Sequence, residues 1–251
     1  MSTIAVITGA SSGIGRATAL KLGQQSFHVL AVGRDASSLE AVCAEIRQAS
    51  GRATSLVSDV TAAGAPAEIV GKARELGGID ALVNAAGVIA SGSVTDTTDD
   101  GWDAMLDVNV RAPFRLIREA APLLAARKGA VVNVSSVAGV RAFPGLTSYC
   151  VSKAAIDQLT RCAALDLAPQ GIRVNAINPG VVVTNLHRRG GMDPEKYAAF
   201  LEKSKITHPL GRAGNPEEIA ELIAFLVSPA AAWISGDTIS IDGGRHLTCL
   251  R

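Results

Sequence analysis

A tyrosine and a lysine four residues apart are the side chains in this sequence best suited to chemistry. Tyr149 and Lys153 occur in the run Tyr-Cys-Val-Ser-Lys, and on a helix that spacing stacks them on one face. A lysine ammonium beside a phenol favours the phenolate and lowers the phenol pKa from about 10 toward a working pH. Such a phenol could give a proton to a carbonyl oxygen or take one from an alcohol. The pair alone is common on solvated helix faces, so its meaning depends on the rest of the chain.

A glycine-rich turn near the start of the chain could hold a phosphate group. The run Thr-Gly-Ala-Ser-Ser-Gly-Ile-Gly over residues 8–15 lies between a predicted strand and a predicted helix, which is the context that dinucleotide binding requires. Its glycines allow the backbone to approach a pyrophosphate, and the helix N-terminus offers free N–H groups. A plain tight turn is the alternative, and the Gly-x3-Gly-x-Gly spacing differs from the common Gly-x-Gly-x2-Gly fingerprint.

Together, these motifs resemble the short-chain dehydrogenase/reductase family, and the resemblance extends over residues 3–244. It implies that Tyr149 is the acid/base, while Lys153 tunes the tyrosine and anchors a ribose. Ser136, thirteen residues before Tyr149, would bond to the substrate oxygen and stabilise charge developing there. Ser135 is the competing candidate, for which packing or a turn bond is favoured. Asn109 would hold a water in a proton relay to the lysine, and an exposed helical asparagine is its alternative.

The same resemblance implies a nicotinamide dinucleotide cofactor. Asp59 would accept a hydrogen bond from the adenine amino group, and Thr184 would help to hold the nicotinamide carboxamide. The family's Asn-Asn-Ala-Gly stretch reads Asn-Ala-Ala-Gly here, so the side-chain bond from the second asparagine is absent at Ala85. The residues expected to bind the cofactor are Gly9, Ser11, Ser12, Gly13, Ile14, Gly15, Arg34, Asp59, Val60, Asn84, Ala85, Gly87, Tyr149, Lys153, Pro179, Gly180, Val182 and Thr184.

The end of the second predicted strand bears on which cofactor is used. An acidic residue there would bind the ribose 2′-hydroxyl and repel a 2′-phosphate. The chain has Gly33 at this position and then Arg34, which can bind a phosphate. Two features argue against NADP: Asp35 follows Arg34 directly, and Ser12 stands where NADP-preferring members often carry a basic residue. Since Gly33 and Arg34 both favour a 2′-phosphate, we expect NADP to be preferred, with NAD possible.

Seven short apolar runs predict the strands that must position these residues. They cover residues 3–8, 28–32, 52–57, 81–85, 130–134, 172–178 and 237–241, and their near-continuous apolar character suits parallel strands covered on both faces. Helical stretches such as 13–25 and 37–49 alternate with them, which indicates βαβ units. The predicted fold is one doubly wound α/β domain over residues 1–251, with a seven-stranded, mainly parallel sheet and helices on both faces. The cofactor would lie across the carboxyl ends of the strands.

A long departure from this rhythm, residues 185–209, predicts a substrate lid. Its Gly190-Gly191 pair provides a flexible joint, and Tyr197, Phe200 and Leu201 would close on the substrate. A surface helix that is permanently packed is the alternative. Two long helices, roughly 99–126 and 147–167, would pair across a two-fold axis in a homo-oligomer, expected to be a tetramer. The apolar residues proposed for that face are Leu116, Ile117, Ala120, Ile156, Leu159 and Ala163.

The balance of charge argues against several partners. With 24 basic and 23 acidic residues the formal net charge is +1, so no field draws the chain to nucleic acid or to an anionic membrane. No stretch of about 18 apolar residues predicts a membrane span, and the N-terminus lacks the basic region of a signal peptide. We expect a cytoplasmic protein.

The cysteines and histidines do not indicate a metal site. Cys43, Cys150, Cys162 and Cys249 show no zinc-like spacing and are expected to be reduced thiols.

The favoured function is an NADP(H)-dependent carbonyl reductase or alcohol dehydrogenase acting on a small ketone–alcohol pair without a metal. The alternatives are an NAD-preferring secondary-alcohol or sugar dehydrogenase and a catalytically silent nucleotide-binding regulator.

Overall fold

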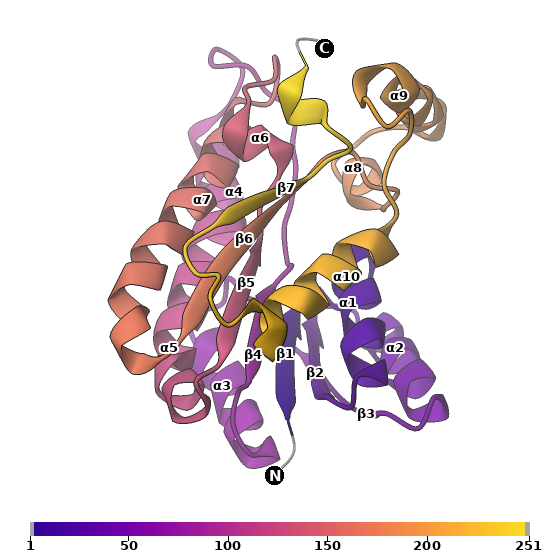
Figure 1. Ribbon diagram of the computed structural model, residues 1–251. Coiled ribbons are helices and arrows are strands. Elements are labelled where there is room, and N and C mark those ends of the chain that lie inside the picture. Colours follow the sequence, from indigo (N-terminus) through magenta and orange to yellow (C-terminus); the bar gives the residue numbers. More distant parts are fainter. Residues whose placement is uncertain (1–2, 249–251) are drawn as a thin grey trace.

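A seven-stranded parallel sheet forms the centre of the computed structural model, which describes residues 3–248 (Figure 1). The strand order is β3-β2-β1-β4-β5-β6-β7, and every neighbouring pair is parallel. The fold class predicted from the sequence is therefore confirmed. The strands are β1 Ile4–Thr8, β2 His28–Gly33, β3 Arg52–Val57, β4 Ala81–Asn84, β5 Ala130–Val134, β6 Arg173–Pro179 and β7 Thr238–Ile241.

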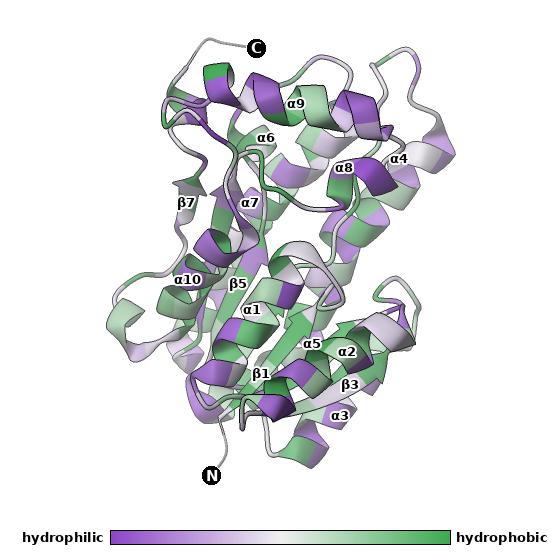
Figure 2. Ribbon diagram, turned by 90° about the vertical axis from the view of Figure 1, so that its right-hand side faces the viewer, coloured by the Kyte–Doolittle hydropathy of each residue, from purple (hydrophilic) through white to green (hydrophobic). Residues whose placement is uncertain are grey.

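Helices cover both faces of the sheet (Figures 1 and 2). On one face α1 (Gly13–Gln24), α2 (Ala36–Gln48) and α10 (Pro216–Val227) pack against the sheet around one apolar cluster. On the other face α3 (Ala65–Leu76), α5 (Ala112–Arg127) and α7 (Thr147–Leu167) enclose a second cluster. Each strand needs apolar side chains on both sides, which explains the continuous apolar runs in the sequence.

The long helix expected over residues 99–126 is not uniform. It consists of α4 (Asp99–Leu106), a π-helical turn (Asp107–Arg111) and α5. π-Helical turns are rare and often occur at functional sites. Pro113 stands near the start of α5, where a missing backbone N–H is tolerated.

The apolar residues expected at a two-fold interface instead cover the sheet within the chain. Leu116, Ile117 and Ala120 of α5 are buried in the second cluster, and so is Ala163 of α7. Ile156 is also buried, at 2% exposure. The apolar stripe of a long helix beside a sheet packs against that sheet first, so the face proposed for the two-fold interface was wrong. The large apolar side chains that α5 and α7 expose are Phe114, Val151 and Leu165.

The strand order reverses between β1 and β4, and this reversal opens a crevice at the carboxyl ends of the strands. The hydroxyl of Thr8, the last residue of β1, accepts hydrogen bonds from the backbone N–H groups of Ala85 (3.2 Å) and Ala86 (3.1 Å). The loop after β4 is thus tied to the end of β1.

The segment expected to be a lid contains two helices, α8 (Leu186–Arg189) and α9 (Pro194–Thr207). Figure 1 shows both beyond the carboxyl ends of the strands, across from α6 (Val137–Val140) and the turn that follows β7. Within residues 3–248, no helix is both long and apolar enough to cross a membrane.

Candidate active site

A cavity of about 820 Å³ opens at the carboxyl ends of the strands, between the switch-point loops and α8. That size falls in the usual range of ligand pockets. Its wall includes Ser136 and every residue predicted to bind the cofactor, with one exception, Asn84. These residues come from separate loops and helix ends and meet in one cavity, and their binding of the cofactor stays a prediction.

The glycine-rich turn packs too closely for side chains. A Cβ added to Gly9 would lie 2.8 Å from the Ala85 carbonyl oxygen, and one added to Gly15 would lie 2.3 Å from the Gly9 oxygen. Gly9 also has φ +66°. Ser12 is the N-cap residue of α1, but its side chain makes no capping hydrogen bond. The first N–H groups of α1 therefore remain available to an anion at the cavity wall, and the turn fits a pyrophosphate.

Asn84 differs from its prediction. Its side chain is 4% exposed and donates a 2.8 Å hydrogen bond to the Asn133 carbonyl oxygen, while the Asn133 amide donates to the Thr160 hydroxyl at 2.9 Å. These buried bonds join β4, β5 and α7. Asn84 is a structural residue that holds the strand ends together, because its side chain turns into the core and not into the cavity.

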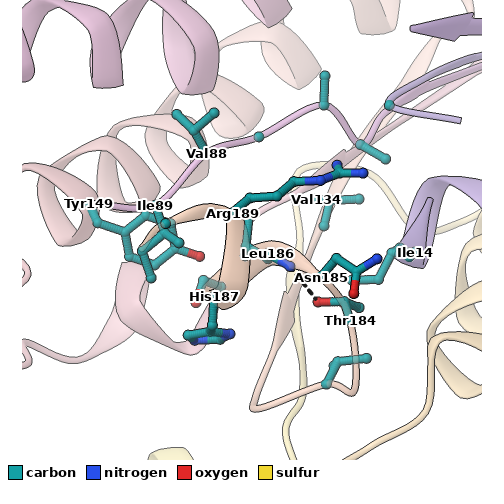
Figure 3. A pocket seen from close by; sticks show the side chains of 18 of the residues that line it. Ile14, Val88, Ile89, Val134, Tyr149, Thr184, Asn185, Leu186, His187 and Arg189 are labelled. Atoms are coloured by element: carbon teal, nitrogen blue, oxygen red, sulfur yellow. Dashed lines mark hydrogen bonds between the residues drawn. The ribbon is translucent and has the colours of Figure 1, made fainter. Parts of the chain in front are cut away.

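Tyr149 and Ser136 meet inside the cavity, and Lys153 lies one helical turn beyond the tyrosine. All three are at least nine-tenths buried. Figure 3 shows the Tyr149 phenol pointing into the cavity between Ile89 and His187. Ser136 is the N-cap residue of α6, and its hydroxyl accepts a 3.1 Å hydrogen bond from the Ala138 N–H. The hydroxyl can still donate its own proton, which is what an oxygen developing negative charge requires.

The two titratable groups are shifted by burial. Burial raises the pKa of Tyr149 to about 12, and the hydrogen bond with Ser136 opposes that rise. Burial lowers the pKa of Lys153 to about 8. The lysine Nζ donates to the Val134 carbonyl oxygen at 2.9 Å and lies 5.6 Å from the centre of the tyrosine ring. In the protein without cofactor, desolvation of the phenolate thus opposes the lowering of the tyrosine pKa that was expected from the lysine.

Hydrogen bonds behind the site fix its backbone. The Ser135 hydroxyl donates to the Lys153 carbonyl oxygen at 3.1 Å, a packing role that the sequence favoured for it. The Asn178 amide donates to the Ser136 carbonyl oxygen and to the Asp157 carboxylate, each at 2.9 Å. Residues from β5, β6 and α7 thus hold the active serine and lysine in place.

Asn109 lies on the π-helical turn, behind the cavity wall. Its amide donates to the Val88 carbonyl oxygen and to the Ser152 hydroxyl, both at 3.0 Å, and its oxygen accepts from the Val88 N–H. Both N–H groups of the side chain are therefore used. A Cβ on Gly87 would lie 3.4 Å from the Asn109 oxygen and 3.7 Å from the Lys153 Nζ, so Asn109 does stand beside the lysine. Its visible role is to hold the loop after β4, and the side chain has no free donor for a water.

The adenosine end of the cavity carries charges of both signs. The Asp59 carboxylate accepts hydrogen bonds from the Thr61 N–H and hydroxyl, which lower its pKa, and Arg34 adds to this effect. Asp35 is the N-cap residue of α2 and accepts a 2.6 Å hydrogen bond from the Ser38 N–H. This carboxylate is therefore bound by the N-terminus of its own helix, which weakens its electrostatic repulsion of a 2′-phosphate.

Several residues line the substrate end of the cavity, and of these the sequence predicted only Phe200, in the expected lid. They lie on the loop after β4, the loop around α6, the lid and the turn after β7, and several appear in Figure 3. Only their place after strands could have indicated them, because no motif marks their types. They include Val88, Ile89, Phe143, Leu146, Leu186, His187, Met192, Phe200 and Arg245.

Tyr197 does not face the substrate end as predicted. Its hydroxyl donates to the Thr184 carbonyl oxygen at 2.8 Å and accepts from the Thr184 N–H at 3.2 Å, which ties α9 to the nicotinamide end of the site. Leu201 also lies outside the cavity wall, whereas Phe200 lines it.

Within residues 3–248, no group of three or more His, Cys, Asp or Glu side chains is arranged to hold a metal ion. Cys43 is buried and Cys162 is exposed as free thiols, and Cys249 lies outside the described residues.

Comparison with known proteins identifies the family. A family model described as enoyl-(acyl carrier protein) reductase matches residues 9–246. The 3-oxoacyl-(acyl-carrier-protein) reductase FabG of Thermotoga maritima is 37% identical over 243 residues, 96% of each chain. Human dehydrogenase/reductase SDR family member 4 is 37% identical over 96% of this chain and 86% of that one. The chain belongs to the short-chain dehydrogenase/reductase family and is an NAD(P)-dependent oxidoreductase.

A solved structure agrees with this assignment. A short-chain dehydrogenase/reductase from Caenorhabditis elegans, crystallised with its cofactor, superposes with a TM-score of 0.91 at 37% identity and covers 98% of this chain and 96% of that one.

The lowered pKa of Lys153 predicts a pH dependence of stability in the protein without cofactor. Between pH 8 and 10 the unfolded chain holds a proton on this lysine that the folded protein lacks, so the free energy of unfolding rises with pH. Urea denaturation should show this rise in the wild type and lose about 2–3 kcal/mol of it in Lys153→Met. Lys205→Met, which removes an exposed lysine of α9, should keep the wild-type slope. Equal slopes in the wild type and Lys153→Met would contradict the burial effect.

Proposed function

We propose that the protein is an NADP(H)-dependent carbonyl reductase or alcohol dehydrogenase that acts on small ketone–alcohol pairs. The observation that carries this proposal is the meeting of Tyr149 and Ser136 in the cavity that the glycine-rich turn also lines. When bound there, the nicotinamide would supply or accept the hydride. The remaining chemistry is the movement of one proton and the stabilisation of one oxygen, and both can be assigned to this chain.

Tyr149 would give its phenolic proton to the substrate oxygen in reduction and take it back in oxidation. The Ser136 hydroxyl would donate a hydrogen bond to the same oxygen as its charge grows. Lys153 stands close enough to stabilise the phenolate while the proton is away. Its positive charge must be present for this, and a pKa near 8 keeps the lysine largely protonated at neutral pH.

The proposed cofactor is NADP, with NAD as the weaker alternative. Arg34 lines the cavity where the second strand ends, and no acidic side chain precedes it. Asp35 is held by α2, so its carboxylate is directed to the helix N-terminus. A 2′-phosphate therefore meets a cation that is exposed and unhindered.

Removing the phenolic hydroxyl tests the role of Tyr149. We expect Tyr149→Phe to lower kcat by roughly 10²–10⁴, because the ring keeps its packing while the proton donor is lost. Binding of NADPH, measured by fluorescence titration, should stay within about threefold of the wild type. If the variant retains more than a tenth of the wild-type kcat, Tyr149 is not the acid/base.

Cofactor choice is tested at Arg34. Arg34→Ala should raise KM for NADPH about tenfold or more and leave KM for NADH nearly unchanged, because only NADPH loses a charged phosphate partner. Gly33→Asp should shift preference further toward NADH, and its Cβ would meet Leu39 at an ordinary 3.4 Å. Arg16→Ala is the matched control, since that arginine pairs with Glu45. If the wild type prefers NADH, the interpretation that Gly33 and Arg34 accommodate a 2′-phosphate is wrong.

Residues 185–209 remain proposed as a lid that closes over cofactor and substrate. Phe200 and His187 line the cavity from this segment, with their ring centres 4.6 Å apart and their planes tilted by 44°. We expect amide hydrogen exchange in residues 186–201 to be fast in the free protein and slow once cofactor and substrate are bound. Equally strong protection in both states would instead indicate a permanently packed helix.

We further propose a single domain over residues 1–251, a cytoplasmic location and a homotetramer. Phe114 and Leu165, at 44% and 78% exposure on α5 and α7, support an apolar contact between subunits. A catalytically silent regulator is disfavoured, because nucleotide binding alone does not require Tyr149, Lys153 and Ser136 to stand together at the cavity.

A further inference from the structure

A buried arginine stands in the substrate end of the cavity. Arg245 opens the short 3-10 turn Arg245–Leu247 that follows β7. It is only 8% exposed, yet it lines the same cavity as Tyr149 and Ser136. Figure 1 shows this turn beside α6 and across from α9, so it faces the lid over the carboxyl ends of the strands.

This arginine lacks a charged partner. Of the ion pairs formed within residues 3–248, none includes Arg245. Its guanidinium donates one long hydrogen bond, 3.4 Å, to the Thr207 carbonyl oxygen. The nearby Asp242 carboxylate is taken by the His246 ring at 2.9 Å and by the N–H groups of Gly244 and His246. Most of the five N–H donors of Arg245 are therefore unused.

The surroundings of Arg245 direct it toward a ligand. One face of its guanidinium lies over the Phe143 ring, with 5.1 Å between Cζ and the ring centre. Phe143 in turn packs against the apolar cluster that contains Tyr149. Only one aromatic side chain thus separates the cation from the group of residues around the acid/base. A buried cation without an anion is costly, and an anionic ligand in the cavity would remove that cost.

The other charged groups of this wall are already compensated or distant. Lys196 pairs with Asp193 at 3.0 Å. Burial lowers the pKa of His187, which keeps its ring neutral. Arg189 acts on Asp35, at the adenosine end. Arg245 is thus a buried cation that forms no ion pair within residues 3–248, with Asp242 acting on it only at longer range and Arg141 adding positive charge nearby, so this part of the wall suits an anionic group.

We propose that Arg245 binds a carboxylate of the substrate, so that the preferred substrates are oxo acids, and the corresponding hydroxy acids, with an apolar segment between the two groups. The planar fork of a guanidinium matches the two oxygens of a carboxylate. Phe143, Leu146, Val88 and Ile89 supply the apolar wall for the segment between. This inference rests on the proposed function, since it names the substrate class of the same site.

Matched pairs of acids and methyl esters test the proposal. The panel contains aliphatic and phenyl-substituted 2-, 3-, 4- and 5-oxo acids with their esters, and kcat/KM is followed as loss of NADPH absorbance. We expect the wild type to favour at least one acid over its ester by tenfold or more. Arg245→Met should remove that preference by raising KM for the acid and leave kcat/KM for the ester within about twofold, since the charge-assisted bond is lost. Arg245→Lys should recover part of it.

Controls separate the possible failures. Lys205→Met removes a positive charge from α9 outside the cavity and should keep the acid preference. Thermal melting checks that Arg245→Met folds, and the wild-type comparison stands even if it does not. Reduction of neutral ketones and esters as fast as of every acid would overturn the carboxylate site and leave the proposed function intact. If no carbonyl is reduced, calorimetric binding of the oxo acids to the NADP-loaded wild type, Arg245→Lys and Arg245→Met still tests the site. Absent binding to the wild type, or equal binding to the wild type and Arg245→Met, would overturn it.

Discussion

The parallel pairing of β1 with β4 is the constraint on which the site depends. Because chain order reverses at this pair, the loops after β1 and β4 diverge to opposite sides and leave a crevice that neither helix layer fills. Thr8 then ties the two loops together through Ala85 and Ala86. The close approach of Gly9 to Ala85 is a consequence of the same pairing, so the glycine-rich turn and the loop after β4 are built as one unit.

The chemistry depends on how the second half of the sheet is buried. Tyr149 and Lys153 project from α7 onto the end of β5, where desolvation disfavours both the phenolate and the ammonium. Burial therefore holds the tyrosine neutral and weakens the lysine's hold on its proton, and each charged form would be stabilised by the other. Proton transfer from the tyrosine would create the phenolate next to the lysine ammonium. The two opposite charges would then attract each other, and they would do so only during the reaction. The buried bonds of Ser135 and Asn178 keep this geometry fixed.

Sequence patterns predicted the fold because parallel strands carry a strong signal. All seven strands fall within a residue or two of their predicted bounds, since a strand covered on both faces must be apolar throughout. Glycines and polar residues after these strands predicted much of the cofactor end of the cavity wall, because parallel strands bring their carboxyl ends to one edge of the sheet. Asn84 was misjudged because a residue at a strand end can turn either into the cavity or into the core, and its partner Asn133 is distant in sequence. The π-helical turn at Asn109 was missed because no residue type marks such a turn in a sequence.

The substrate end lay beyond sequence reasoning for a different reason. Phe143, His187 and Arg245 come from three segments with no common motif, and only the folded chain brings them to one wall. The cofactor end needs backbone geometry, which glycine spacing records. The substrate end needs side-chain chemistry, which any loop of suitable length can supply. This difference explains why the family can be recognised from its glycine-rich turns. The substrate must instead be inferred from the charges that line the cavity, and among these the buried Arg245, which forms no ion pair within residues 3–248, is the most informative.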